Sequence, residues 1–154
     1  MIIVPGQCIG SLRFLSSQRE VCEQLGPPGH RHDYGDGRER WDYPQSNVLF
    51  LEGYGVMSVS LEHGPAMLWD TDVFGLSVPQ LIAWLGHHEV QARVEYICRS
   101  CGDLTVEASS LGLSVYYFDD EGEESMPEGL EISVVEWARG TLVQHPEAST
   151  PPGS

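Results

Sequence analysis

The chain has 154 residues, of which 41% are hydrophobic and 20% charged, and its formal net charge is −15 at pH 7. Global disorder is therefore not expected, and the negative charge disfavours binding to nucleic acid and to anionic membranes. No stretch approaches the roughly 20 apolar residues that cross a bilayer. The first ten residues also lack the basic and long apolar regions of a secretory signal, so we expect a cytoplasmic protein.

The negative charge is concentrated in the second half of the chain. Residues 1–64 contain 5 arginines against 8 acids, a net charge of −3, and residues 65–154 contain 3 arginines against 15 acids, a net charge of −12. A field of this sign attracts basic proteins and raises their association rates. It is equally typical of cytosolic proteins that are acidic for solubility alone.

Two segments 60 residues apart share one helix pattern. Residues 17–26 and 77–86 both open with serine and carry Glu20 or Gln80 three residues later, which predicts a capping box. Each segment ends in glycine, which favours the left-handed residue after a helix. Apolar residues four apart predict one buried face on each helix. The four side chains expected to be buried are Val21, Leu25, Leu81 and Leu85.

Strand patterns follow each predicted helix. In the first half they cover residues 40–43, 48–52 and 56–61, with a glycine turn at residues 53–55. In the second half they cover residues 90–97, 104–108, 113–118 and 130–137. The predicted fold class is α+β, with two tandem similar modules, each a short helix packed on an antiparallel β-sheet. The modules are expected at residues 1–64 and 65–139, followed by a flexible tail at residues 140–154.

The order of helix, Leu-Gly-Pro, polar loop, Trp-x-Tyr and hairpin resembles the SmpA/OmlA-type repeat of small outer-membrane assembly lipoproteins. As a tandem pair it is similar to the β-lactamase-inhibitor-protein fold. The resemblance rests on residues 21–28, on Trp41-Asp42-Tyr43 and on the hairpin ending at Leu61. It covers most of residues 12–61 and, more loosely, residues 72–137. The lipoproteins carry a lipidated cysteine behind a signal, whereas Cys8 follows no signal. The resemblance therefore implies a fold used for protein recognition, without an outer-membrane anchor.

Cys98 and Cys101 form a CxxC pair of the kind that binds zinc. A structural zinc site needs four ligands, usually two such pairs, and Cys8 and Cys22 are too far apart in sequence to form the second. Zinc would require the fold to gather these cysteines or to recruit the histidines at 87–88. Free thiols in a turn are the simpler interpretation. Because no histidine lies in a recognisable nucleophile motif, we expect no catalytic centre and no cofactor.

The acidic segment between the last two predicted strands is the main candidate for partner binding. Its carboxylates would attract arginine and lysine side chains of a basic protein. Aromatic residues on the predicted strands would supply the desolvated contacts that give most interface energy. The predicted partner-binding residues are Asp119, Asp120, Glu121, Glu123, Glu124, Trp41, Asp42, Tyr43 and Tyr116. The alternative is a solvated hairpin tip, with the aromatic residues buried in the core.

These features favour an interaction protein over an enzyme. The leading hypothesis is a cytoplasmic immunity or inhibitor protein that masks the active site of a basic toxin of the nuclease type. One alternative is a scaffold or adaptor protein without a toxin partner, and another is a zinc-dependent regulator centred on Cys98 and Cys101. A toxin gene beside this one would separate the first hypothesis from the second, and stoichiometric zinc would favour the third.

Overall fold

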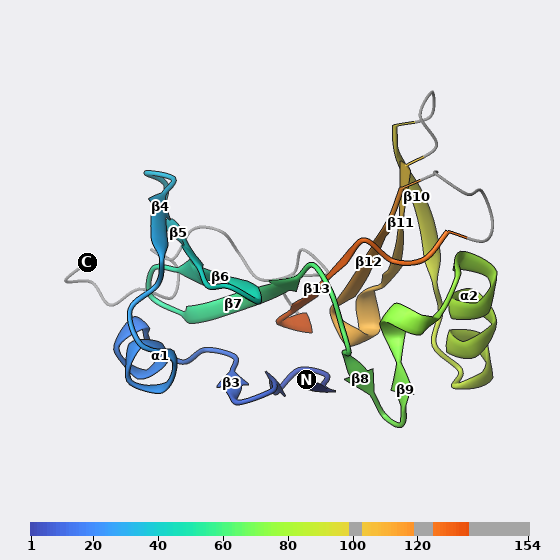
Figure 1. Cartoon of the computed structure of the whole chain (residues 1–154), viewed down its shortest axis with the longest axis horizontal. Coiled ribbons are helices and arrows are strands. Elements are labelled where there is room, and N and C mark those ends of the chain that lie inside the picture. The colour runs from blue at the N-terminus through green and yellow to red at the C-terminus, as the bar shows by residue number, and fades with distance from the viewer. Residues whose placement is uncertain (99–102, 119–124, 136–154) are drawn as a thin grey trace.

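The structure is a computed structural model that describes residues 1–98, 103–118 and 125–135. It has an α+β fold in which sheet predominates (Figure 1). The α-helices are α1 (Gln18–Leu25) and α2 (Val78–His87), and the 3-10 helices are η1 (Val73–Gly75) and η2 (Ser109–Leu111). In the described part of the chain, no helix is long and apolar enough to cross a membrane.

The strands form two sheets. The smaller sheet has the order β3-β2-β1-β8-β9, and the larger has the order β10-β11-β12-β13-β7-β6-β5-β4. The smaller sheet consists of β1 (Ile2–Val4), β2 (Cys8–Ile9), β3 (Leu12–Arg13), β8 (Met67–Leu68) and β9 (Thr71–Asp72). The larger sheet consists of β4 (His30–Asp33), β5 (Arg38–Asp42), β6 (Ser46–Leu51), β7 (Gly55–Leu61), β10 (Arg93–Cys98), β11 (Asp103–Ala108), β12 (Leu113–Tyr117) and β13 (Gly129–Ser133).

The larger sheet is antiparallel throughout, and the two halves of the chain meet in its middle. The first half contributes α1 followed by β4 to β7, and the second contributes α2 followed by β10 to β13. Strands β7 and β13 pair with each other, so that Leu61 lies opposite Leu130 and Val59 opposite Ile132. One continuous sheet therefore runs through both halves.

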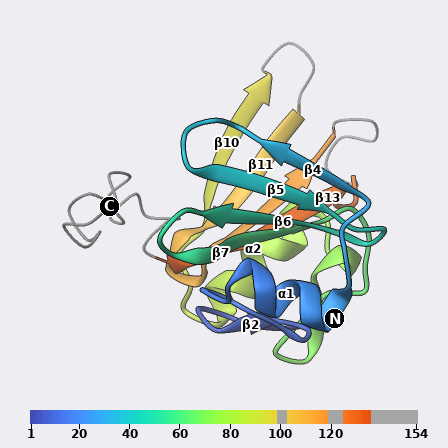
Figure 2. The same cartoon turned by 90° about the vertical axis from the view of Figure 1, so that its left-hand side faces the viewer.

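A single hydrophobic core lies on one face of the larger sheet. It joins Val21 of α1, Leu85 of α2 and Ile9 of the smaller sheet to sheet residues such as Val59 and Ile132, all fully buried. Figures 1 and 2 show both helices and the smaller sheet beneath the larger sheet. The larger sheet rises at both edges, toward β4 and toward β10, so its backbone is curved (Figure 1). We call the concave side, opposite to the core, the trough face.

The helix starts follow the sequence prediction. At α1, the Glu20 N–H donates to Ser17 Oγ and the Ser17 N–H donates to Glu20 Oε1, both at 3.1 Å. At α2, the Ser77 N–H donates to Gln80 Oε1 at 2.9 Å. Such contacts satisfy backbone donors that have no partner within the helix.

The end of α2 differs from the prediction. Gly86 was expected to follow the helix, but α2 continues to His87. The Val90 N–H donates to the Leu85 carbonyl and the Glu89 N–H to the Gly86 carbonyl. This is the Schellman arrangement, which places Glu89 in the left-handed region with φ 59°. The extension brings His88 onto the same helical face as Trp84.

Several strands lie outside the predicted set. Residues 30–32 fall in the polar loop expected between Leu-Gly-Pro and Trp-x-Tyr, but they lie in the exposed edge strand β4. Short strands also form within residues 2–13 and 67–72, for which no strand was predicted. Strand β13 ends at Ser133, short of the predicted end at residue 137, which lies outside the described residues.

The prediction that Leu25 is buried is wrong. Leu25 is the last residue of α1 and is 38% exposed, because it lines an open groove of about 300 Å³ beside Met1 and Tyr43. Val21, Leu81 and Leu85 are fully buried, as predicted. We expect Leu25→Ala to lower the unfolding free energy by about 1 kcal/mol or less. Urea titration checks this, and a loss as large as that of Leu85→Ala would contradict it.

Candidate functional site

The trough face of the larger sheet carries a polar row that crosses all eight strands. Strand register places Arg93, Glu107, Ser114, Glu131, Ser60, Asn47, Asp42 and His30 side by side in that order. The neighbouring residues in each strand point to the core, because side chains alternate between the two faces. No described helix lies over this face (Figure 1). We call this surface the trough row.

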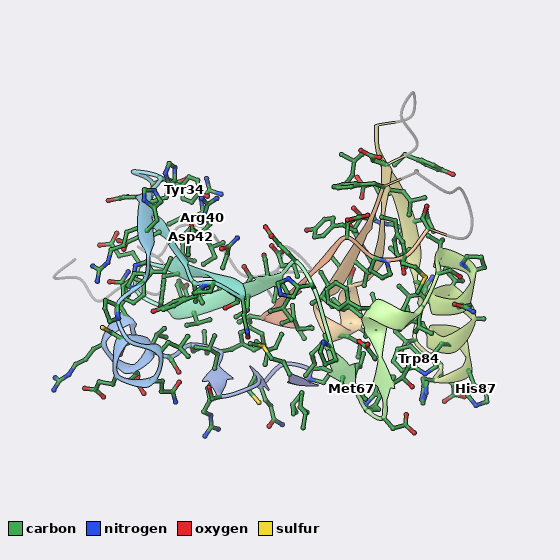
Figure 3. All side chains as sticks on the ribbon, in the orientation of Figure 1. Tyr34, Arg40, Asp42, Met67, Trp84 and His87 are labelled. Atoms are coloured by element: carbon green, nitrogen blue, oxygen red, sulfur yellow. The ribbon has the colours of Figure 1, made fainter. Side chains whose placement is uncertain are left out.

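Ion pairs fix both ends of the trough row. Arg93 Nη2 lies 2.7 Å from Glu107 Oε2, and Arg40 Nε lies 2.8 Å from Asp42 Oδ1. The Asp42 hydrogen bond raises the pKa of Arg40. Figure 3 shows Arg40, Asp42 and Tyr34 together on the trough side of β4 and β5. The charges at these ends are therefore already compensated within the protein.

Glu131, in the middle of the row, has a different environment. The hydroxyl groups of Ser133 and Ser60 lie 3.3 and 3.4 Å from its carboxylate oxygens. None of the ion pairs in the described part of the chain involves it. Burial raises the pKa of Glu131, and the two hydroxyl groups offset this only in part. The centre of the sheet thus holds a desolvated carboxyl group to which no described residue supplies a cation.

Tyr116 lies beside Glu131 on the same face. Burial, followed by the charges of Glu131 and Glu107, raises the pKa of Tyr116 to about 12. The phenol therefore stays protonated at neutral pH and can donate a hydrogen bond. A half-buried tyrosine beside a desolvated carboxyl group is suited to contact a cationic side chain.

The structure separates the predicted partner-binding residues into three groups. Asp42 and Tyr116 lie on the trough face. Trp41 and Tyr43 are directed toward the opposite, core face. The acidic residues Asp119, Asp120, Glu121, Glu123 and Glu124 lie outside the described residues.

The prediction that Trp41 is exposed for partner binding needs correction. Trp41 is only 2% exposed and packs on Phe50, with ring centroids 4.7 Å apart. Tyr43, on the same face as Trp41, is half-buried, and the Tyr43 hydroxyl donates to the Gly26 carbonyl at 2.9 Å. Both rings hold the first half together, because the core lies on their side of the sheet.

The described residues show no metal-binding arrangement. Cys8 and Cys22 are free thiols, and no three His, Cys, Asp or Glu side chains of the described part are grouped to hold a metal ion. Cys98 ends β10, but its side chain and all of Cys101 lie outside the described set. The proposed zinc pair therefore stays a prediction.

Sequence reasoning did not single out Glu131. The sequence does contain one indication, the order Leu130-Glu131-Ile132 within a predicted strand. Because side chains alternate along a strand, this order places Glu131 on the face opposite to the two apolar residues. The sequence pattern does not show which strands lie on either side of this one. Only the pairing of β13 with β7 and β12 brings Ser60 and Tyr116 to Glu131.

No family model and no curated protein matches the chain. Among solved structures, it is similar to YjgB from Bacillus subtilis, described as a DUF4309 family protein, at 10% identity and a TM-score of 0.49, over 83% of this chain and 87% of that one. It is also similar to an extracellular protein containing an SCP domain from Bacillus anthracis and to a cysteine-rich secretory protein from Staphylococcus aureus. Both share 10% identity, with TM-scores of 0.46 and 0.38, over 80% and 77% of this chain. The matches span 45% and 43% of those two proteins. With TM-scores below 0.5, these likenesses assign no function.

Proposed function

We propose that the chain is a binding protein whose trough face receives a basic partner protein. The observation that carries the proposal is Glu131, a carboxyl group near the centre of the larger sheet that is desolvated and forms no ion pair with any described residue. A carboxylate that is partly removed from water and has no cationic partner is costly to the free protein. Such a cost is offset when a partner supplies a cation, since charged groups that are desolvated together are typical interface hot spots.

The overall charge supports the same partner class. The net charge of −15 would steer a basic protein toward this one from a distance. A basic toxin of the nuclease type, neutralised in the cytoplasm by masking of its cleft, is the partner we favour. We further infer that residues 1–64 and 65–139 are two related modules. The repeated order of one capped helix and four antiparallel strands supports this inference.

Glu131→Gln should separate binding from folding. Burial raises the pKa of Glu131, so the folded state holds the proton more tightly than the unfolded chain does. The stabilisation from that proton is complete below the unfolded pKa and is lost as pH rises through the folded pKa. We therefore expect Glu131→Gln to match the wild type in acid and to be more stable at neutral pH, as measured by urea titration at both pH values.

The same variant should bind a basic partner more weakly although it is more stable. The partners to test are purified basic proteins encoded beside this gene, with affinity measured by calorimetry. We expect a loss of about tenfold or more, because a hot-spot contact is worth at least 1.4 kcal/mol. Glu107→Gln is the matched control, since Glu107 already pairs with Arg93 at 2.7 Å. Equal affinity of Glu131→Gln and wild type would contradict a binding role for the trough face.

A further inference from the structure

A second surface lies away from the trough, where the turn between β8 and β9 meets the end of α2. The Trp69 ring stacks on His88, with centroids 4.3 Å apart, and lies 5.3 Å from Trp84. His88 also contacts Trp84 at 5.1 Å and His87 at 5.7 Å. Figure 3 shows Trp84 and His87 together on the side of the molecule opposite to Tyr34 and Arg40. We call Trp69, Trp84 and His88 the indole cluster.

Both chain segments of the indole cluster hold a non-glycine residue in the left-handed region. Trp69 has φ 56° at the first position of a two-residue turn between Leu68 and Thr71, and Glu89 has φ 59° after α2. Side chains rarely adopt this region, and a bulky residue there is an outlier. At Glu89 this is the ordinary left-handed residue of the Schellman helix end, whereas at Trp69 it is strain that the surroundings impose, and such strain is concentrated at functional sites.

The indole cluster is exposed and has acidic neighbours. Trp69 is 45% exposed, although an indole of this size is usually well covered. Asp70 and Glu89, the next residues after Trp69 and His88, are exposed. No arginine in the described ranges forms an ion pair with either acid. An exposed indole, in a cluster whose two chain segments each continue into an exposed acid without an ion pair to a described residue, suits a planar cation.

We propose that the indole cluster binds an arginine side chain from a basic protein segment. The guanidinium group would lie on the exposed face of Trp69, with Asp70 and Glu89 supplying charge. Arginine fits better than lysine because its planar group stacks on an indole and still donates hydrogen bonds to a carboxylate. The ring contacts with His88 and Trp84 hold Trp69 in place. This proposal does not rest on the trough face.

The competing explanation is a brace between the β8–β9 hairpin and α2. Ring stacking of this kind stabilises a fold without any ligand. The two explanations differ in one respect: a brace affects stability alone, whereas a cation site also affects affinity. The test therefore measures both in the same variants.

The probe is a blocked tetra-arginine peptide, titrated into the full-length protein labelled with nitrogen-15. We expect the Trp69 indole signal and the His88 backbone signal to shift, with tetra-lysine giving a weaker effect. Trp69→Ala should weaken binding about 3- to 10-fold, as expected for a cation–π contact. Trp69→Phe, which keeps an aromatic ring, should lose less affinity. It also serves as the test variant if Trp69→Ala does not fold. The double variant Asp70→Asn, Glu89→Gln should also bind more weakly.

The controls separate this surface from other parts of the protein. Tyr96 is 54% exposed on β10, outside the indole cluster, so Tyr96→Ala should leave the affinity unchanged. Glu131→Gln should leave the Trp69 shift unchanged, so failure of the trough proposal and failure of this one are distinguishable. The proposal is overturned if Trp69→Ala and Trp69→Phe lower the melting temperature with unchanged affinity. It is also overturned if the peptide shifts only signals around Glu131.

Discussion

Gly112→Ala should lower the unfolding free energy by about 2–5 kcal/mol. Gly112 has φ 70° and lies between η2 and β12, where it is the left-handed residue that ends η2. A methyl group there would overlap the Ser133 carbonyl oxygen, which belongs to the backbone of β13 and cannot rotate away. The Ser133 N–H also donates to the Gly112 carbonyl at 2.8 Å. The substitution therefore combines the left-handed backbone cost of about 1–2 kcal/mol with overpacking of about 1–3 kcal/mol.

Gly86→Ala is the matched control for this prediction. Gly86 lies inside α2, and a Cβ added there meets nothing within 4 Å beyond its chain neighbours and the backbone of its own helix. Alanine is a better helix former than glycine by about 0.5–1 kcal/mol, so this variant should be more stable than the wild type. Urea titration of both variants checks the opposite signs. A Gly112→Ala protein as stable as the wild type would contradict the close approach of β12 and β13.

The helices show how far the sequence pattern could be followed. The serine caps and the apolar spacing placed both helix starts correctly, because these signals act between residues three and four apart. The prediction that each helix ends at a glycine with positive φ is confirmed at Gly26, with φ 79°. It is wrong at Gly86, because α2 continues and Glu89 takes the left-handed position. Glycine favours a helix end but does not require one. Local pattern therefore predicted where α2 begins but not where it ends.

The strands show the limit set by contacts distant in sequence. Alternation predicted most strands of the larger sheet, but β4 has four exposed residues and so carries no apolar pattern. In the smaller sheet, the pairing of β1 with β8, which places Ile3 opposite Leu68, joins segments more than 60 residues apart. The same limit concealed the trough row and the indole cluster. Trp69 meets His88 only because the β8–β9 hairpin lies against α2.

Trp41→Ala should lower the unfolding free energy by about 3–5 kcal/mol. The ring is 2% exposed, and Arg31 covers it from the edge strand β4 with the guanidinium carbon 4.4 Å from the ring centroid. Its Nε1–H donates to Glu39 Oε2. Removing the ring leaves a cavity beside Phe50, and it deprives both Glu39 and Arg31 of a partner. The loss therefore exceeds that expected for a tryptophan on a binding surface.

Tyr34→Ala is the control that distinguishes the two faces of β4 and β5. Tyr34 is 39% exposed on the trough side, and its ring contacts His32 with centroids 4.5 Å apart. We expect Tyr34→Ala to lower the unfolding free energy by about 1 kcal/mol or less. Denaturant titration at neutral pH measures both variants. Because Trp41 lies beneath the sheet and the trough lies above it, any Trp41→Ala protein that stays folded should associate with a basic partner at the wild-type rate. A slowed association with unchanged stability would instead place Trp41 on the binding surface.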